Sequence, residues 1–217
     1  MSYGIRVQNS SGFVQIDDTY DNFVLHQTGT VSASKNSSAT ISYADTGSLP
    51  IIAIRTVSGG SMAISGFSTT SAEFRGGNDG DATVEYRVYR RLAGVPASSS
   101  NYGLRVYNGA QALTYDSERA YMRIMQLATF TSEQVASGPF FTLNHSFGHA
   151  FAIINDPRVF IGAYITSNPN WWVIPAIKTG TNSISVTESW IPTGVPPVGS
   201  PYADFFPFKK TIGVVLP

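Results

Sequence analysis

The 217-residue chain contains no cysteine, which excludes disulfide bonds and thiolate metal sites. Charge is scarce as well: 13% of residues are charged, and 14 basic residues balance 14 acidic ones. A chain with no net charge has no general attraction to nucleic acid or to an anionic membrane, so we expect neither partner. No apolar run approaches the roughly 18–20 residues of a membrane span, and residues 1–20 lack the basic start and apolar stretch of a secretion signal.

Helical periodicity is also nearly absent. Short alternating runs of Val, Ile, Thr and aromatic residues recur at intervals of roughly 8–12 residues, separated by Gly, Pro, Asn and Ser, which is typical of sandwiches and barrels. The best helical candidate, Ser117–Gln126, alternates as well, and we interpret it as a strand. The predicted strands include Gly4–Val7, Phe13–Ile16, Asn22–His26, Ile51–Val57, Thr83–Arg90, Leu104–Tyr107, Ala112–Tyr115, Phe151–Ile154, Trp171–Ala176 and Thr211–Val215. The predicted fold class is all-β.

One stretch of the sequence occurs twice. Residues 3–17 read YGIRVQNSSGFVQID, and residues 102–116 read YGLRVYNGAQALTYD. The two align without a gap, and each predicts a β-hairpin, with the second turn centred on Asn108-Gly109. Tandem duplication of one β module explains the repeat better than chance matching of short strand-turn-strand pieces.

The duplication predicts two tandem antiparallel β-sandwich-like domains. The first module covers residues 1–93 and the second covers residues 102–217. Residues 94–101 join them, because small residues and one Pro without a strand pattern are typical of a linker.

Each copy of the repeat carries one arginine and one aspartate at equivalent positions. Arg6 and Arg105 lie on the first strand of each hairpin, and Asp17 and Asp116 end the second strand. The simpler interpretation is a cross-strand ion pair that contributes well under about 1 kcal/mol when it is exposed. The alternative is a bridge to the adjoining module or to another subunit.

Aromatic residues are the candidates for an interface or a glycan contact. Trp171 and Trp172 follow a turn, and adjacent residues of a strand point to opposite faces, which leaves one of them free to meet a partner or a sugar. Tyr202, Phe205 and Phe206 crowd the C-terminal segment in the same way. Core packing, interface packing and sugar stacking all remain open for these side chains.

Catalytic, cofactor-binding and metal-binding residues are not predicted. His145 and His149 are four residues apart, but on a strand this spacing separates them by about 13 Å, too far for one metal. The acidic stretches at residues 17–21 and 78–81 resemble fragments of calcium loops without the full set of oxygen ligands. The glutamates show no spacing that would support a glycoside hydrolase. We therefore predict a protein that is not an enzyme and needs no cofactor.

The pattern Tyr-Gly-Ile-Arg-Val-x-Asn-x-x-Gly-x-x-x-Ile-Asp at residues 3–17, repeated at 102–116, resembles the start of small proteins encoded among the tail genes of tailed bacteriophages. The resemblance implies a virion protein of the tail tip, baseplate or fibre, made in the host cytoplasm. Such a protein joins other tail proteins, such as the tail hub and fibre, and helps the particle attach to a host receptor or glycan. The alternative is a carbohydrate-binding, lectin-like module.

The composition also favours self-association. A solvated monomer usually carries about 25% charged residues, so 13% is typical of surfaces that are buried in an assembly. Exposed strand edges favour pairing between copies, and we expect a homo-oligomer, with a trimer favoured.

Overall fold

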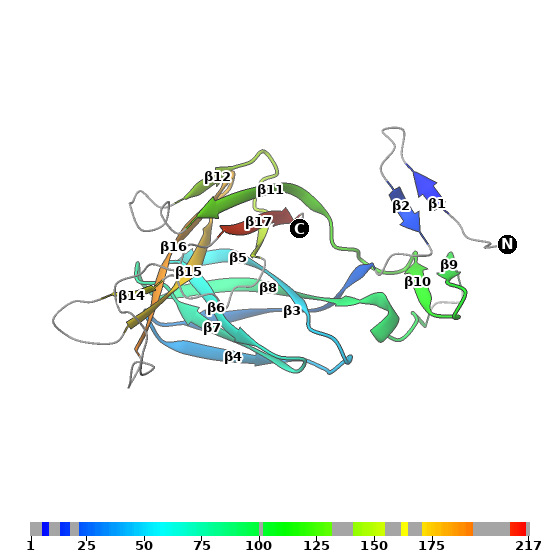
Figure 1. Ribbon diagram of the computed structural model, residues 1–217, viewed down its shortest axis with the longest axis horizontal. Helices are drawn as coiled ribbons and strands as arrows, with labels where there is room; N and C mark the ends of the chain where they lie inside the picture. The colour runs from blue at the N-terminus through cyan, green and yellow to red at the C-terminus, as the bar shows by residue number, and fades with distance from the viewer. Residues whose placement is uncertain are drawn as a thin grey trace.

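The computed structural model describes residues 6–8, 14–17, 22–99, 102–131, 141–154, 162–164, 171–192 and 209–215, which form an all-β protein (Figure 1). The predicted fold class is confirmed. The strands are β1 (Arg6–Gln8), β2 (Val14–Asp17), β3 (Phe23–Ala33), β4 (Ser38–Ser42), β5 (Ile51–Gly59), β6 (Met62–Phe67), β7 (Ser71–Gly76), β8 (Ala82–Arg91), β9 (Arg105–Tyr107), β10 (Leu113–Asp116), β11 (Ile124–Thr131), β12 (Thr142–Asn144), β13 (Phe151–Ile154), β14 (Gly162–Tyr164), β15 (Trp171–Thr179), β16 (Ser183–Pro192) and β17 (Lys209–Val215). A 3-10 turn, η1 (Leu92–Gly94), follows β8.

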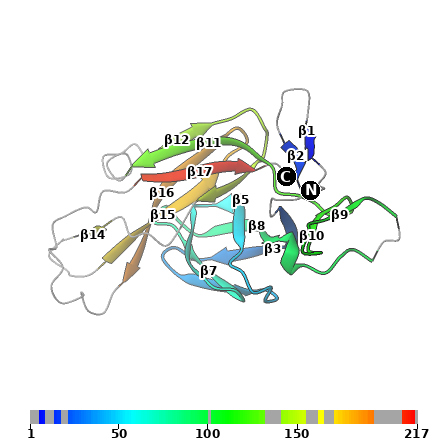
Figure 2. The ribbon, with the colours of Figure 1, turned by 45° about the vertical axis from the view of Figure 1, so that its right-hand side comes forward.

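Two antiparallel sheets form the body of the molecule. The first has the order β11-β17-β13-β5-β8-β3, and the second has the order β12-β16-β15-β6-β7-β4, with β14 also paired to β15. Side chains of both sheets meet in one hydrophobic core, which makes the body a sandwich. The hairpins β1-β2 and β9-β10 are separate two-stranded sheets at one end of this body (Figures 1 and 2).

Strand β8 shows how the sequence builds these layers. Successive side chains of a strand point to opposite faces, and every second residue over most of β8 is buried in the core between the sheets. These buried residues are Ala82, Val84, Tyr86 and Val88. Burial of one large apolar side chain contributes roughly 1.5–3 kcal/mol, so a slip of one residue in register would be strongly unfavourable.

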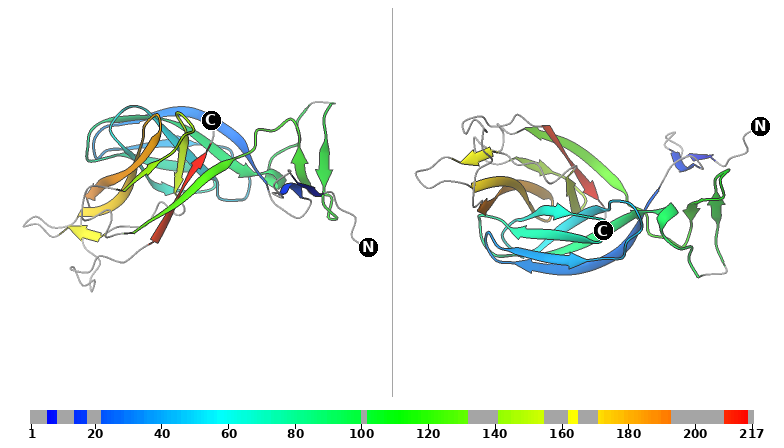
Figure 3. Two further views of the ribbon diagram at one scale, coloured as in Figure 1. Left: turned by 90° about the horizontal axis from the view of Figure 1, so that it is seen from above. Right: turned by 60° about the horizontal axis from the view of Figure 1, so that its bottom comes forward.

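In each sheet the strands of the two halves of the chain are arranged symmetrically about the middle of the sheet. In the first sheet β3-β8-β5 meets its counterpart β13-β17-β11, and in the second β4-β7-β6 meets β15-β16-β12. The halves join at the antiparallel pairs Ile54↔Ala152 and Met62↔Ile177. Strands from both halves of the chain therefore lie in each sheet (Figure 3).

The prediction of two tandem sandwiches needs revision in one respect. Strands of residues 1–93 and of residues 102–217 share both sheets, so among the described residues the two units build one sandwich together. The physical reason is that β5 and β6 would each leave an unpaired edge if the first unit stood alone, and the second unit covers both edges. The boundaries, the 94–101 linker and the duplication itself remain predictions, and the symmetric strand order is what a duplication would produce.

The two outer edges of the first sheet converge at the hairpin end. Val24 at the start of β3 forms an antiparallel bridge with Tyr121, just before β11. A second small core gathers at this place, where Leu92, Val95 and Leu113 pack with Val24. The β9-β10 hairpin of the second half thus rests on residues of the first half.

Candidate interaction site

The two copies of the repeated stretch form hairpins with matching pairs at their base. In β9-β10, Arg105 lies opposite Asp116, and in β1-β2, Arg6 lies opposite Asp17. The predicted cross-strand placement of these residues is confirmed. Side chains are described only for β9-β10, so the site is built on that hairpin.

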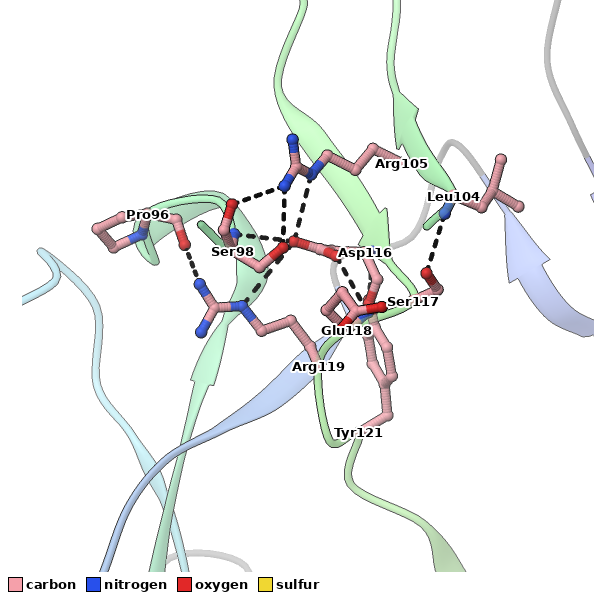
Figure 4. A network of polar contacts seen from close by, with 9 residues as sticks. All are labelled: Pro96, Ser98, Leu104, Arg105, Asp116, Ser117, Glu118, Arg119 and Tyr121. Atoms are coloured by element: carbon pink, nitrogen blue, oxygen red, sulfur yellow. Dashed lines mark hydrogen bonds and ion pairs between the residues drawn. The ribbon is translucent and has the colours of Figure 1, made fainter. Parts of the chain in front are cut away.

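Asp116 is the centre of a polar network that fixes the hairpin to the preceding segment (Figure 4). Its carboxylate is 1% exposed and accepts hydrogen bonds from the N–H groups of Ser98 (3.0 Å) and Glu118 (3.1 Å). Arg105 Nε and Arg119 Nε lie 3.6 and 4.0 Å from Asp116 Oδ2. Arg105 Nη2 also donates to the carbonyl oxygen (2.6 Å) and to Oγ (2.9 Å) of Ser98. Arg105 and Asp116 therefore do not form the exposed ion pair that the sequence suggested. They belong to a buried network that also binds the segment before the hairpin through Ser98.

The surroundings of Asp116 favour its charged form. Burial by itself would raise the pKa of Asp116, but the hydrogen bonds from Ser98 and Glu118 and the charge of Arg105 outweigh it and hold the pKa below its ordinary value of 3.8. The carboxylate is therefore ionised in the folded hairpin at neutral pH.

Tyrosine and asparagine side chains attach the other face of the hairpin to the body. The N–H of Asp116 donates to Tyr121 Oη (2.6 Å), and the ring of Tyr121 stacks on Tyr115 with centroids 5.1 Å apart. Asn22 Nδ2 donates to the carbonyl oxygen of Thr114 (2.7 Å). Since Asn22 and Tyr121 lead directly into β3 and β11, the hairpin is tied to both outer strands of the first sheet.

The turn of this hairpin is wider than the predicted Asn108-Gly109 turn. Strand β9 ends at Tyr107 and β10 starts at Leu113. Asn108 Oδ1 closes the loop by accepting hydrogen bonds from the N–H groups of Ala110 (3.0 Å) and Ala112 (2.9 Å). The asparagine thus acts through its side chain, as in other Asx-stabilised turns.

Three aromatic or aliphatic side chains in and just before this rigidly held hairpin are exposed. Tyr102 is 86% exposed, Leu104 is 47% exposed and Tyr107 is 52% exposed, whereas Val106 between them is buried. Exposed aromatic and aliphatic side chains on a pre-ordered element are typical anchors of protein interfaces. We call Tyr102, Leu104 and Tyr107 the hairpin patch. Alternation in the sequence does not mark these residues as exposed, because Leu104 and the buried Val106 occupy alternate positions of the same stretch.

The aromatic residues proposed from the sequence are only partly placed. Trp171 and Trp172 begin β15, where their backbones pair with β14 on one side and with β16 on the other. Their side chains, and all of Tyr202, Phe205 and Phe206, lie outside the described residues. Their roles as interface or glycan contacts therefore stay predictions.

The histidines lie in unrelated surroundings. His145 is buried, its Nδ1 accepts a hydrogen bond from the N–H of Phe147 (3.3 Å), and its Nε2 has no partner among the described residues. His149 is exposed in the same loop, with a φ of 47°. Burial lowers the pKa of His145, and burial together with Arg90 and Arg119 lowers the pKa of His26.

These shifts predict a pH dependence of stability. Unfolded histidine binds a proton near its ordinary pKa of 6.5, whereas folded His26 and His145 resist protonation, so the free energy of unfolding should fall as the pH drops below 6.5. Urea denaturation between pH 7.5 and 5.5 measures this loss. The double variant His26→Gln/His145→Gln should show a flatter profile in this range, and a profile as steep as that of the wild type would contradict the prediction.

The acidic stretch at residues 78–81 is used for turn structure. Asp79 Oδ1 accepts hydrogen bonds from the N–H (2.8 Å) and Oγ (2.6 Å) of Ser61, while Asp81 Oδ1 accepts one from the N–H of Lys35 (2.8 Å). The two carboxylates therefore serve different loops. Within the part of the chain that the structure describes, no group of three or more histidine and acidic side chains is placed to hold a metal ion.

Comparison with protein-family models, with curated proteins and with solved structures gives no match for this chain. Over the described ranges, no helix has the length and apolar character needed to cross a membrane. The function is therefore argued from the geometry of the molecule.

Proposed function

We propose that the chain is a non-enzymatic structural protein of a tailed-bacteriophage particle, located in the tail tip, baseplate or fibre. It joins other tail proteins, such as the hub or fibre, and helps the particle attach to its host. The observation that carries the proposal is the hairpin patch on the β9-β10 hairpin, in a chain that has no charge excess of either sign.

Two features support an assembly role for this hairpin. Its Asp116 network orders the hairpin before any partner arrives, which lowers the entropy cost of binding. The hairpin also contains one copy of the repeated stretch that resembles phage tail proteins. A docking element that is rigid and carries exposed apolar side chains suits a permanent joint in a particle.

The test is incorporation into particles. In the phage that encodes the protein, with the chromosomal copy of the gene inactivated, a plasmid supplies either the wild type or the variant Leu104→Ser/Tyr107→Ser. We expect the wild type to be found in purified particles by mass spectrometry. The variant should be reduced at least tenfold, because losing two central apolar anchors costs about 2 kcal/mol or more.

The matched control is Val57→Ser, which removes an exposed apolar side chain (58% exposed) on strand β5 of the sandwich. This variant should enter particles as the wild type does. Absence of the wild-type protein from purified particles would overturn the proposed function. Normal incorporation of the double variant would show that the hairpin patch is not the contact through which the protein joins the particle.

A further inference from the structure

The outer face of the first sheet has a different character in its two halves. The symmetric strand order gives each residue of one half a counterpart in the other, counted outward from the central pair Ile54↔Ala152. One row runs from Arg55 through Glu85 to Thr30. Its counterpart runs from Ile153 through Gly213 to Leu127.

The first of these rows is polar and internally paired. Arg55 and Glu85 form an ion pair, and the guanidinium of Arg55 lies 4.9 Å from the ring centroid of Phe151. Thr30, at the end of the row, is an exposed residue of the outer strand β3. This half of the outer face is therefore polar and suited to contact with solvent.

The second row is apolar and ends in exposed side chains. Leu127 on the outer strand β11 is 62% exposed, and its neighbours Met125 and Ile124 are 46% and 44% exposed. The counterpart of Leu127 in the other half is Thr30, so the position itself does not require an apolar residue. The apolar side chains on β11 are a property of this half alone.

Strand β11 is also an open edge. Among the described residues, β17 is its only strand partner, and the strand contains no charge and no proline, the usual means by which an edge resists pairing. Its bulge lies near the start, between Ile124 and Gln126, which leaves the following residues regular. A regular, uncharged edge with exposed apolar side chains is suited to accept another strand.

We propose that β11 pairs with β11 of a second copy of the chain, antiparallel and centred on Leu127. The first sheets of the two copies then form one continuous sheet. The inference goes beyond the proposed function, which concerns contacts with other tail proteins, and names a surface through which copies of the chain associate. It replaces the expected trimer by a two-fold dimer, because pairing of identical antiparallel strands is two-fold by construction.

The sequence of β11 fits its own reverse. Centred on Leu127, the pairing places Met125 opposite Thr129 and Leu127 opposite its own copy, and no two like charges meet. In this register Leu127 of each copy meets its counterpart at the two-fold axis, and Met125 of one copy lies diagonally across from Leu127 of the other.

The test uses the purified full-length protein and sedimentation velocity. The wild type should sediment as a dimer at tens of micromolar. Leu127→Lys places two ammonium groups opposite each other and should raise the dissociation constant at least tenfold. The matched control Thr30→Lys changes the counterpart position on β3 and should leave the dimer intact.

A covalent test removes dependence on a single variant. The chain has no cysteine, so Leu127→Cys carries one thiol, and directly opposed residues of antiparallel strands have Cβ atoms about 4.5–5.5 Å apart, close to disulfide reach. Mild oxidation should give a disulfide-linked dimer for Leu127→Cys and not for Thr30→Cys. Circular dichroism confirms that each variant is folded.

A wild type that sediments as a monomer or a trimer would overturn the proposal. So would a Leu127→Lys variant that dimerises as the wild type does, or equal cross-linking at Thr30→Cys. These measurements need no phage particle, so the dimer and the proposed function can fail separately.

Discussion

Replacing Asp116 with Ala is expected to loosen the β9-β10 hairpin by roughly 3–5 kcal/mol, because the change leaves two arginines and two backbone N–H groups without their shared buried acceptor. The loss is local, since the network belongs to the hairpin and not to the main core. Hydrogen exchange of the Ser117 amide, which bonds to the carbonyl oxygen of Leu104, measures it. We expect exchange to be faster by a factor on the order of a few hundred to a few thousand.

Two comparisons define the cause. Asp81→Ala removes an exposed carboxylate with one backbone N–H partner and should cost about 1 kcal/mol or less.

Asp116→Asn keeps the shape of the side chain and removes its charge. Because the pKa of Asp116 is lowered in the folded state, its stabilisation is complete above its ordinary value of 3.8 and is lost as the pH falls through the folded value. The difference between the wild type and Asp116→Asn should therefore narrow below about pH 4. A constant difference down to pH 2.5 would contradict the electrostatic explanation.

Replacing Arg90 with Met is expected to lower the free energy of unfolding of the sandwich by roughly 3–5 kcal/mol. Arg90 is fully buried near the end of β8, and its guanidinium donates to three backbone carbonyl groups, of Ser48, Ala44 (3.0 Å) and Thr69 (2.6 Å). It also lies 4.9 Å from the ring centroid of Tyr43. Methionine fills most of the space but leaves the three carbonyl oxygens without donors. Urea denaturation measures the loss.

The neighbouring residue supplies the control for this prediction. Arg91 is exposed at the last position of β8, and Arg91→Met should change stability by about 1 kcal/mol or less. If both substitutions have the same effect, the hydrogen bonds of Arg90 to the loops do not stabilise the sandwich as the structure indicates.

The sequence by itself determined the features that depend on neighbouring residues. Short alternating or apolar runs predicted the cores of most strands, for example the apolar run Phe151–Ile154, which matches β13. The repeated stretch predicted two hairpins and placed Arg105 opposite Asp116, because hairpin register follows from a short turn. Strand β12 was missed because three residues are too few to show a period.

Only the tertiary structure decided how the halves combine and which polar groups are buried. The pairs Ile54↔Ala152 and Met62↔Ile177 join residues about a hundred positions apart, and nothing local distinguishes them from pairings inside one module. Burial of Asp116 depends on Ser98, which lies 18 residues earlier in the chain and donates its N–H to the carboxylate. From the sequence alone, this carboxylate could not be distinguished from one on the surface. The exposure of Leu127 follows from the place of β11 at the edge of the sheet. A side chain at the same position of a central strand would have a neighbouring strand on each side.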